Sequence, residues 1–258
     1  MALYGVLGDI HGNREALVAA LDGLDADGIG NLLCVGDLVG YNADGADCVA
    51  MLEARGAACI AGNHDLIGTG RLGFERCSNK AMHSLKRTRR TLDARTARKL
   101  QELPSHRMIE GRVLLTHGGV RDVQQYMTQP KHIVENIAYL EADFPLARIC
   151  FFGHTHEQRV FEVDAGTVRE VAIGETLLLR LDCRYFINPG SVDASRKRAA
   201  KLAEYAVFDS TALTIRFHRV PYDDAAAEAK AAAQGFRIDP WRDRLYDWQR
   251  RIAGPRQL

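Results

Sequence analysis

The stretch LYGVLGDIHGN, residues 3–13, decides the fold, because it joins a short apolar run to a polar turn bounded by two glycines. The apolar run at 3–7 has the length of a buried strand, and Asn13 stands where a helix N-cap is expected. Leu17, Leu21 and Leu24 then recur on one face of a helix predicted over about 13–24. A strand, a polar turn and an amphipathic helix in this order indicate a βαβ unit.

The same alternation continues along the chain. Further strands are predicted at 31–35 and 58–61, with a helix at about 46–55 that ends before Gly56. The second half is richer in strands, predicted at 113–116, 149–152, 167–173, 176–182, 185–187, 205–208 and 213–220. Helices are predicted at about 132–140 and, in an Ala-rich stretch, at about 224–234. The first half therefore predicts a parallel sheet, and the whole chain an α/β fold.

The composition is that of one globular domain. The chain has 258 residues, of which 47% are hydrophobic and 26% charged. Its net charge of +1 gives no overall attraction for nucleic acid or membranes, so any preference must come from local clusters. Between Arg71 and Arg107, eleven Lys or Arg stand against three acidic residues. We expect a single domain over 1–258, with a basic helical insertion at about 66–110 and a C-terminal helical tail at about 224–258.

Several features bear on compartment and assembly. The N-terminus lacks the basic and apolar regions of a signal peptide, and no apolar run approaches the ~18 residues of a membrane span. The six cysteines are scattered without a CxxC pair, which is typical of reduced thiols. We expect a cytoplasmic protein with no membrane partner. Trp241 and Trp248 lie seven residues apart in the predicted tail helix, which indicates packing or a contact in a homo-oligomer.

Five predicted strands are each followed by side chains that bind metals. These clusters are GDIHGN at 8–13, GD at 36–37, GNHD at 62–65, THGG at 116–119 and GHTH at 153–156. The carboxyl ends of parallel strands meet at one edge of a sheet. Carboxylates, an amide and imidazoles without thiolate suit Mn, Fe, Zn, Co or Ni, and they are too many for one tetrahedral ion. Two divalent ions about 3.5–4 Å apart would acidify a bridging water to hydroxide for in-line attack on phosphorus.

In this order the clusters resemble the calcineurin-like metallophosphoesterase superfamily, whose pattern is DxH, GD, GNH[D/E], H and GHxH. The resemblance runs from Leu3 to His156. The later NPGSV at 188–192 is similar to a loop in the superfamily's small single-domain bacterial and archaeal phosphodiesterases. The resemblance implies the metallo-dependent phosphatase fold, a four-layer αββα sandwich of two mixed β-sheets.

The resemblance also implies which residues bind metal. One ion would be held by Asp9, His11 and His156, the other by Asn63, His117 and His154, with Asp37 bridging them. His64 is left as the catalytic side chain, which protonates the leaving group or stabilises phosphoryl charge. An imidazole with an ordinary pKa of ~6.5 suits that task. Asp65 would orient the loop, and Mn²⁺ is the expected metal.

One departure from the superfamily bears on substrate. The Ser/Thr protein phosphatases carry GDxxDRG, whereas this chain has GDLVGY at 36–41 and so lacks both the Asp that orients the histidine and the Arg that binds phosphate. A protein phosphatase is therefore not favoured. The basic segment would then bind the substrate, with Arg71 and Arg76 as candidates, and Arg196, Lys197 and Arg198 after the NPGSV loop as further ones. A solvated basic helix face is an equally ordinary explanation.

The leading hypothesis is a phosphodiesterase or nucleotide phosphohydrolase that acts on a small phosphate ester or a nucleotide. Two alternatives stay open. The superfamily includes a non-catalytic retromer subunit that has lost metal ligands, so an interaction module is one. A DNA nuclease is the other, although the chain has no obvious capping domain, and nucleic acid is not the favoured partner.

Overall fold

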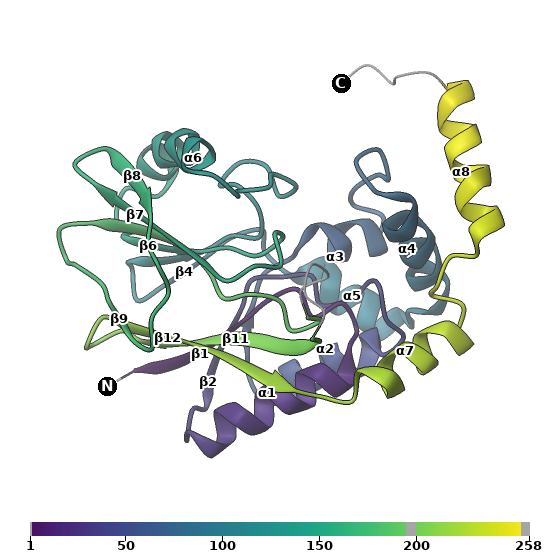
Figure 1. Cartoon of the computed structure of the whole chain (residues 1–258), viewed down its shortest axis with the longest axis horizontal. Coiled ribbons are helices and arrows are strands. Elements are labelled where there is room, and N and C mark those ends of the chain that lie inside the picture. Colours follow the sequence, from purple (N-terminus) through teal and green to yellow (C-terminus); the bar gives the residue numbers. More distant parts are fainter. Residues whose placement is uncertain (1, 195–199, 254–258) are drawn as a thin grey trace.

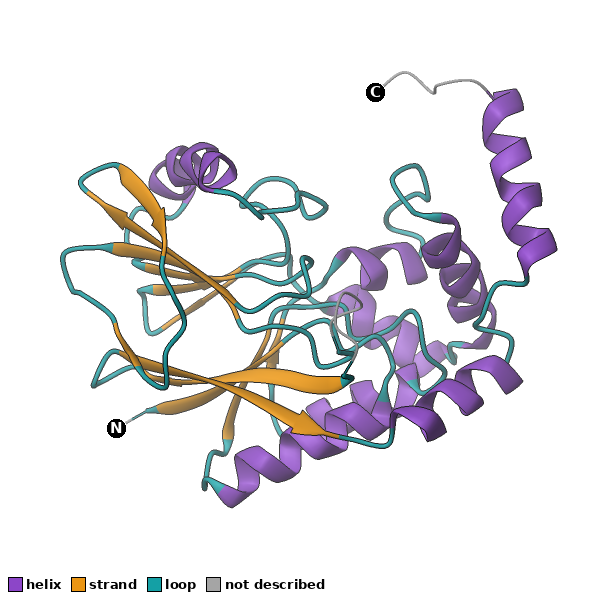
Figure 2. Cartoon of the chain, in the orientation of Figure 1, coloured by secondary structure: helices purple, strands orange, loops and turns teal. Residues whose placement is uncertain are grey.

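Two β-sheets face each other with helices on both outer sides (Figure 1). The computed structural model describes residues 2–194 and 200–253, and side chains up to residue 249. Arg196, Lys197 and Arg198 lie outside the described residues. The helix and strand layers of Figure 2 form the predicted αββα sandwich, so the expected fold class is confirmed.

The first sheet has the strand order β3-β2-β1-β11-β12-β9. Its strands are β1 (Leu3–Leu7), β2 (Asn31–Cys34), β3 (Ala58–Cys59), β9 (Leu177–Leu178), β11 (Leu202–Asp209) and β12 (Thr214–Pro221). The strands β1, β2 and β3 are parallel, whereas β11 runs antiparallel to β1. The parallel strands are those of the predicted βαβαβ unit, and their carboxyl ends lie at one edge.

The second sheet has the strand order β4-β5-β6-β10-β7-β8. Its strands are β4 (Arg107–Ile109), β5 (Val113–Leu115), β6 (Ile149–Phe151), β7 (Arg159–Asp164), β8 (Thr167–Glu170) and β10 (Arg184–Asn188). The strands β5, β6 and β10 are parallel, and the other pairs are antiparallel. Both sheets are therefore mixed.

The helices cover the outer faces. The first sheet is covered by α1 (Arg14–Ala26) and α2 (Gly45–Ala54), and the second by α6 (Pro130–Asp143). The Asn13 side chain accepts a hydrogen bond from the Ala16 N–H at 3.0 Å, so it caps α1 as predicted. The remaining helices are α3 (Asn63–Gly68), α4 (Asn79–Thr91), α5 (Ala94–Glu102), α7 (Asp224–Ala233) and α8 (Pro240–Ala253).

Side chains alternate between two cores along each central strand. In β6, Ile149 and Phe151 point into the core between the sheets, whereas Cys150 packs under α6. The Phe151 ring meets Phe208 of β11 edge to face, with 5.5 Å between the ring centres. Because both faces of such a strand are buried, the sequence shows a continuous apolar run rather than an alternating one.

Three strand predictions were wrong. No strand was predicted at β4, which lies inside the segment that was predicted to be a helical insertion. No strand was predicted at β7, because its charged residues interrupt the apolar pattern expected of a buried strand. Glu162 is nevertheless buried there, where it accepts hydrogen bonds from Tyr185 at 2.6 Å and Arg169 at 2.6 Å. A strand predicted over 176–182 is paired only at Leu177–Leu178. Leu179 still packs into the core between the sheets, but Leu178 and Leu181 face solvent, with Leu181 77% exposed.

The basic segment folds as helices whose cations largely serve the fold. Arg89 donates to the backbone oxygens of Ile67 and Leu72, and its guanidinium lies 4.2 Å from the ring centre of Phe74. Lys99 pairs with Glu53 of α2 at 2.6 Å. These contacts attach the segment to α3 and α2, so much of its charge is not available to a partner.

Two further features concern compartment. All six cysteines are buried and free. Among the described residues, no helix has both the length and the apolar composition needed to cross a bilayer.

The core between the sheets makes a direct prediction about stability. Phe151→Ala removes a fully buried ring, so we expect it to lower the free energy of unfolding by about 3–5 kcal/mol in urea titrations. The exposed Leu181→Ala is the control, with an expected change within about 0.5 kcal/mol. Equal effects of the two substitutions would contradict this description of the core.

Candidate metal centre

Five loops meet at the carboxyl edge of the parallel strands. The loop after β1 is joined to the loop after β2, because the Ile10 and His11 N–H groups both donate to the Asp37 carbonyl at 2.9 and 2.8 Å. In the second sheet, the Gly153 N–H donates to the His117 carbonyl at 2.8 Å. The backbone itself therefore brings the five sequence clusters to one place.

The first group of facing side chains comprises Asp9, His11 and His156. Their ligand atoms all lie within 4.8 Å of one another. The Nε2 atoms of His11 and His156 are 3.0 Å apart, and His156 Nε2 is 3.6 Å from Asp9 Oδ1. Two nitrogens that bind one ion at about 2.1 Å and at right angles lie about 3 Å apart, so this spacing fits a shared metal.

The second group comprises Asp37, His117 and His154, with Asn63 beside it. His117 Nε2 lies 3.0 Å from Asn63 Oδ1 and 3.3 Å from Asp37 Oδ2. The same Asp37 oxygen is 3.7 Å from His11 Nε2 in the first group. Asp37 thus lies between the two groups, where one carboxylate can contact two cations.

Backbone carbonyls fix the orientation of two of these imidazoles. His117 Nδ1 lies 2.7 Å from the Val35 carbonyl, and His11 Nδ1 lies 3.3 Å from the Val39 carbonyl. A carbonyl only accepts, so each Nδ1 carries a proton and Nε2 is the nitrogen that can bind a metal. His154 Nε2 is buried and has no hydrogen-bond partner among the described residues. This donor set fits divalent metal ions.

The local charges favour cation binding. Burial would raise the pKa of Asp37, but the imidazoles of His117, His64 and His11 hold that pKa well below its usual range. Burial, together with His117, lowers the pKa of His154 to about 3, so this imidazole is neutral. Burial opposes protonation of His117, but Asp37 raises its pKa to about 9. A metal that binds His117 at neutral pH therefore displaces a proton.

The backbone is strained at the same positions. Five non-glycine residues with candidate ligand side chains have left-handed φ angles between 51° and 66°: Asp9, His11, Asp37, His154 and His156. Such a conformation costs of order 1–3 kcal/mol per residue and persists where the surroundings enforce it. Backbone strain concentrated on candidate ligands is typical of a functional site.

Asp65 is the anchor of the loop that carries Asp37. Its carboxylate accepts four backbone hydrogen bonds, from Asp37 and Gly62 to Oδ2 and from Leu38 and Val39 to Oδ1, at 2.9–3.1 Å. A Cβ on Gly62 would lie 2.1 Å from Asp37 Oδ1, so only glycine allows the two loops to approach this closely.

His64 lies beside the two groups and is 5% exposed. Its backbone N–H donates to Asp37 Oδ1 at 2.7 Å. Its ring centre is 4.6 Å from that of Tyr41 and 4.5 Å from that of His11. A Cβ on Gly40 would lie 2.3 Å from His64 Nδ1. Gly40 and Tyr41 stand where the protein phosphatases have Asp and Arg, so the ring packs here against a bare backbone and an aromatic side chain.

The cavity at these groups has a volume of about 130 Å³. Of the two arginines predicted to bind substrate, Arg76 lines it. Arg76 donates to both Asp122 oxygens at 2.8 Å and to the Gln124 carbonyl at 2.8 Å. Arg71 instead donates to the Gln101 carbonyl at the end of α5, at 3.0 Å, and is not among the described residues that line the cavity.

Sequence reasoning missed two aromatic residues of this cavity. Tyr41 and Tyr126 both line it. The Tyr126 ring centre lies 4.1 Å from that of His154, although the Tyr126 side chain is 60% exposed. The only signal for Tyr41 was its place just after the GD cluster, and Tyr126 lies in a loop without a motif.

Comparison with known proteins gives the family and agrees with the fold. Residues 2–212 match the profile of the calcineurin-like phosphoesterase superfamily domain. An uncharacterised protein of Methanocaldococcus jannaschii is 27% identical over 245 residues, which are 93% of this chain and 95% of that protein. A metallophosphoesterase from Sphaerobacter thermophilus is similar in structure, with a TM-score of 0.77 and 27% identity over 94% of this chain and 97% of that one. A hypothetical protein from Pyrococcus horikoshii shares the fold, with a TM-score of 0.69 and 17% identity over 95% of this chain and 97% of that one.

The Asp65 anchor generates a prediction. Asp65→Asn turns an NH₂ group toward backbone donors and leaves buried N–H groups without acceptors. We expect a loss of at least about 2 kcal/mol in the free energy of unfolding of the metal-free protein, measured by urea titration.

Asp93→Asn is the matched control. Asp93 also accepts from a backbone N–H, that of Thr96 at 2.9 Å, but at the exposed N-cap of α5, where Asn caps equally well. An Asp65→Asn protein as stable as the Asp93→Asn protein would show that the anchor does not hold the loop.

Proposed function

Because the chain belongs to the calcineurin-like phosphoesterase superfamily, we propose that it hydrolyses a phosphodiester or a nucleotide at a centre of two divalent ions, with Mn²⁺ as the native metal. The superfamily makes the chain a metal-dependent phosphoric ester hydrolase. The observation that carries the two-ion proposal is Asp37 Oδ2, which lies 3.7 Å from His11 Nε2 and 3.3 Å from His117 Nε2.

The proposed ligands follow the two groups of side chains. Asp9, His11 and His156 would hold one ion, Asn63, His117 and His154 the other, and Asp37 both. Bound there, the ions would supply an acidified water and positive charge for the phosphoryl oxygens.

His64 is the proposed catalytic side chain. Its backbone N–H donates to Asp37 Oδ1 at 2.7 Å, and its ring contacts those of Tyr41 and His11 at the wall of the cavity. From this position the imidazole can donate a proton to the leaving oxygen. The ring packs against the Gly40 backbone, because a Cβ at position 40 would lie 2.3 Å from Nδ1.

Arg76 is the proposed substrate-binding cation. It lines the cavity, and its ion pair with Asp122 fixes the guanidinium at the rim. We do not propose nucleic acid as the substrate, because cations such as Arg89, Arg71 and Lys99 are engaged in contacts within the protein.

The first test is hydrolysis of bis-p-nitrophenyl phosphate beside p-nitrophenyl phosphate by metal-free protein reconstituted with Mn²⁺. We expect turnover of the diester and two ions per chain by elemental analysis. His64→Ala should lower kcat at least about 100-fold with both ions retained, because it removes only a proton donor. Asp37→Asn should lose activity and metal together.

His132→Ala is the control, because His132 is a histidine outside the metal groups, bonded to the Thr128 N–H at 3.2 Å. Unchanged diester turnover in Asp37→Asn, or a single ion per chain, would refute the two-ion centre. Turnover of the monoester alone would replace the phosphodiesterase with a phosphatase.

A further inference from the structure

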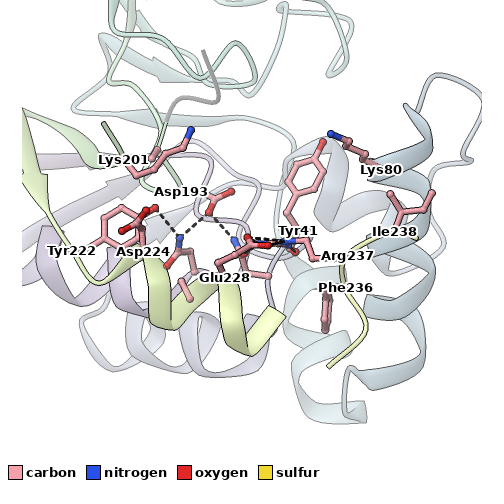
Figure 3. Close-up of a pocket in the computed structure, with 14 residues that line it drawn as sticks. Tyr41, Lys80, Asp193, Lys201, Tyr222, Asp224, Glu228, Phe236, Arg237 and Ile238 are labelled. Atoms are coloured by element: carbon pink, nitrogen blue, oxygen red, sulfur yellow. Dashed lines mark hydrogen bonds and ion pairs between the residues drawn. The ribbon is translucent and has the colours of Figure 1, made fainter. Parts of the chain in front are cut away.

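A second, larger cavity opens beside the metal centre, with a volume of about 580 Å³ (Figure 3). It is lined by residues from distant parts of the chain, among them Asn13, Asn42, Asp193, Tyr222 and Ala227. The metal-centre cavity, at about 130 Å³, has room for a phosphoryl group and little more. An organic group of the substrate must therefore lie outside it, and the second cavity has the size of an ordinary ligand pocket.

The two cavities share one lining residue. Tyr41 lines both of them, and its ring contacts His11 and His64 on the side of the metal centre. The backbone N–H of Asp193 donates to the carbonyl of Asp9 at 3.0 Å, so the floor of the second cavity is attached to the loop of a proposed metal ligand. A group bound in the second cavity would thus lie near the loop that carries Asp9 and on the other face of Tyr41 from the metal centre.

The floor of the second cavity is a fixed polar network. Asp193 Oδ1 accepts hydrogen bonds from Asn13 Nδ2 at 2.8 Å and from Asn42 Nδ2 at 2.7 Å (dashed in Figure 3). Arg237 in turn donates to Asn42 Oδ1 at 3.0 Å. Asn13 and Asn42 are buried, and a carboxylate held in place by amides is a preorganised acceptor for hydroxyl groups.

Aromatic side chains flank this floor. Tyr41 and Tyr222 stand on opposite sides of it in Figure 3. Aromatic rings bind planar bases by stacking. A carboxylate that can accept hydrogen bonds from hydroxyl groups, flanked by aromatic rings, matches a nucleoside, in which a sugar is joined to a planar base.

The described residues of the cavity carry charges of both signs. Its cations are Lys80, Lys201 and Arg237, and its carboxylates are Asp193, Asp224 and Glu228. The Arg237 guanidinium is also paired with Glu228, with Nε 2.8 Å from both carboxylate oxygens. No excess of positive charge remains among the described lining residues.

We propose that this cavity binds the nucleoside of a nucleotide substrate while its phosphate lies at the metal centre; this rests on the function proposed above. The NPGSV motif at 188–192 gains a role here, because it places Asp193, the next residue, in the floor. The small side chain of Ala227, on α7, keeps the cavity open.

The test is equilibrium binding to the Mn²⁺-loaded protein, with inorganic phosphate and the four common nucleoside 5′-monophosphates as probes. We expect at least one monophosphate to bind tenfold or more tightly than phosphate. Ala227→Leu places an isobutyl group in the cavity. In this variant the affinity for the monophosphate, divided by the affinity for inorganic phosphate, should fall to about one. Ala229→Leu is the matched control, since Ala229 is an exposed alanine of the same helix, and it should keep the ratio of the unmodified protein.

Tyr222→Ala is the second variant, in case Ala227→Leu fails to fold, and it should also reduce the ratio. The inference is overturned if no monophosphate binds more tightly than phosphate, or if both variants keep the full ratio. Hydrolysis of bis-p-nitrophenyl phosphate reports separately on the proposed function. If the diester is hydrolysed but nucleotides bind no better than phosphate, only the proposed nucleoside cavity is overturned. If both variants abolish a preference for nucleotides but neither ester is hydrolysed, the cavity is supported and the proposed hydrolysis is refuted.

Discussion

The buried carboxylate of Asp65 accepts four backbone N–H groups from the two loops that carry Asp37 and Asn63. This contact fixes where the Asp37 side chain stands, and Asp37 in turn lies between two groups of imidazoles and holds the backbone of His64. The geometry of both groups therefore depends on one side chain that touches neither substrate nor any proposed ligand atom directly. A carboxylate that satisfies four buried donors also leaves little freedom for the loops to separate.

The strained backbone of the site is held by the rest of the fold. Asp9, His11 and Asp37 have left-handed φ angles, and hydrogen bonds between loops hold each of these residues in place. The Asp9 N–H donates to the Gly36 carbonyl at 3.0 Å, and the Gly12 N–H to the Leu38 carbonyl at 2.8 Å. The site is preorganised in this sense: the cost of the strained conformations is met during folding, before any ion or substrate binds.

The sequence predicted the parts of the site that are local in the chain. A polar cluster directly after a strand must lie at the sheet edge, so the positions of Asp9, Asp37 and His154 follow from the strand assignments alone. Tyr126 and Asp193 could not be placed in this way, because loops whose paths depend on tertiary packing bring them to the cavities. Charge was also a poor guide to position. Glu162 concealed β7, and the Arg71 guanidinium donates to the Gln101 carbonyl of α5, although Arg71 was predicted to bind substrate.

The close packing of Gly40 against His64 also limits how such a site can evolve. A side chain at position 40 would collide with the imidazole, and the φ angle of Gly40 is +136°, which side chains rarely adopt. An aspartate cannot therefore replace Gly40 in the GDLVGY motif, as in the GDxxDRG motif, unless the His64 imidazole and the backbone at residue 40 also move. The choice of residue at position 40 is thus coupled to where the His64 imidazole stands, and neither can be changed without the other.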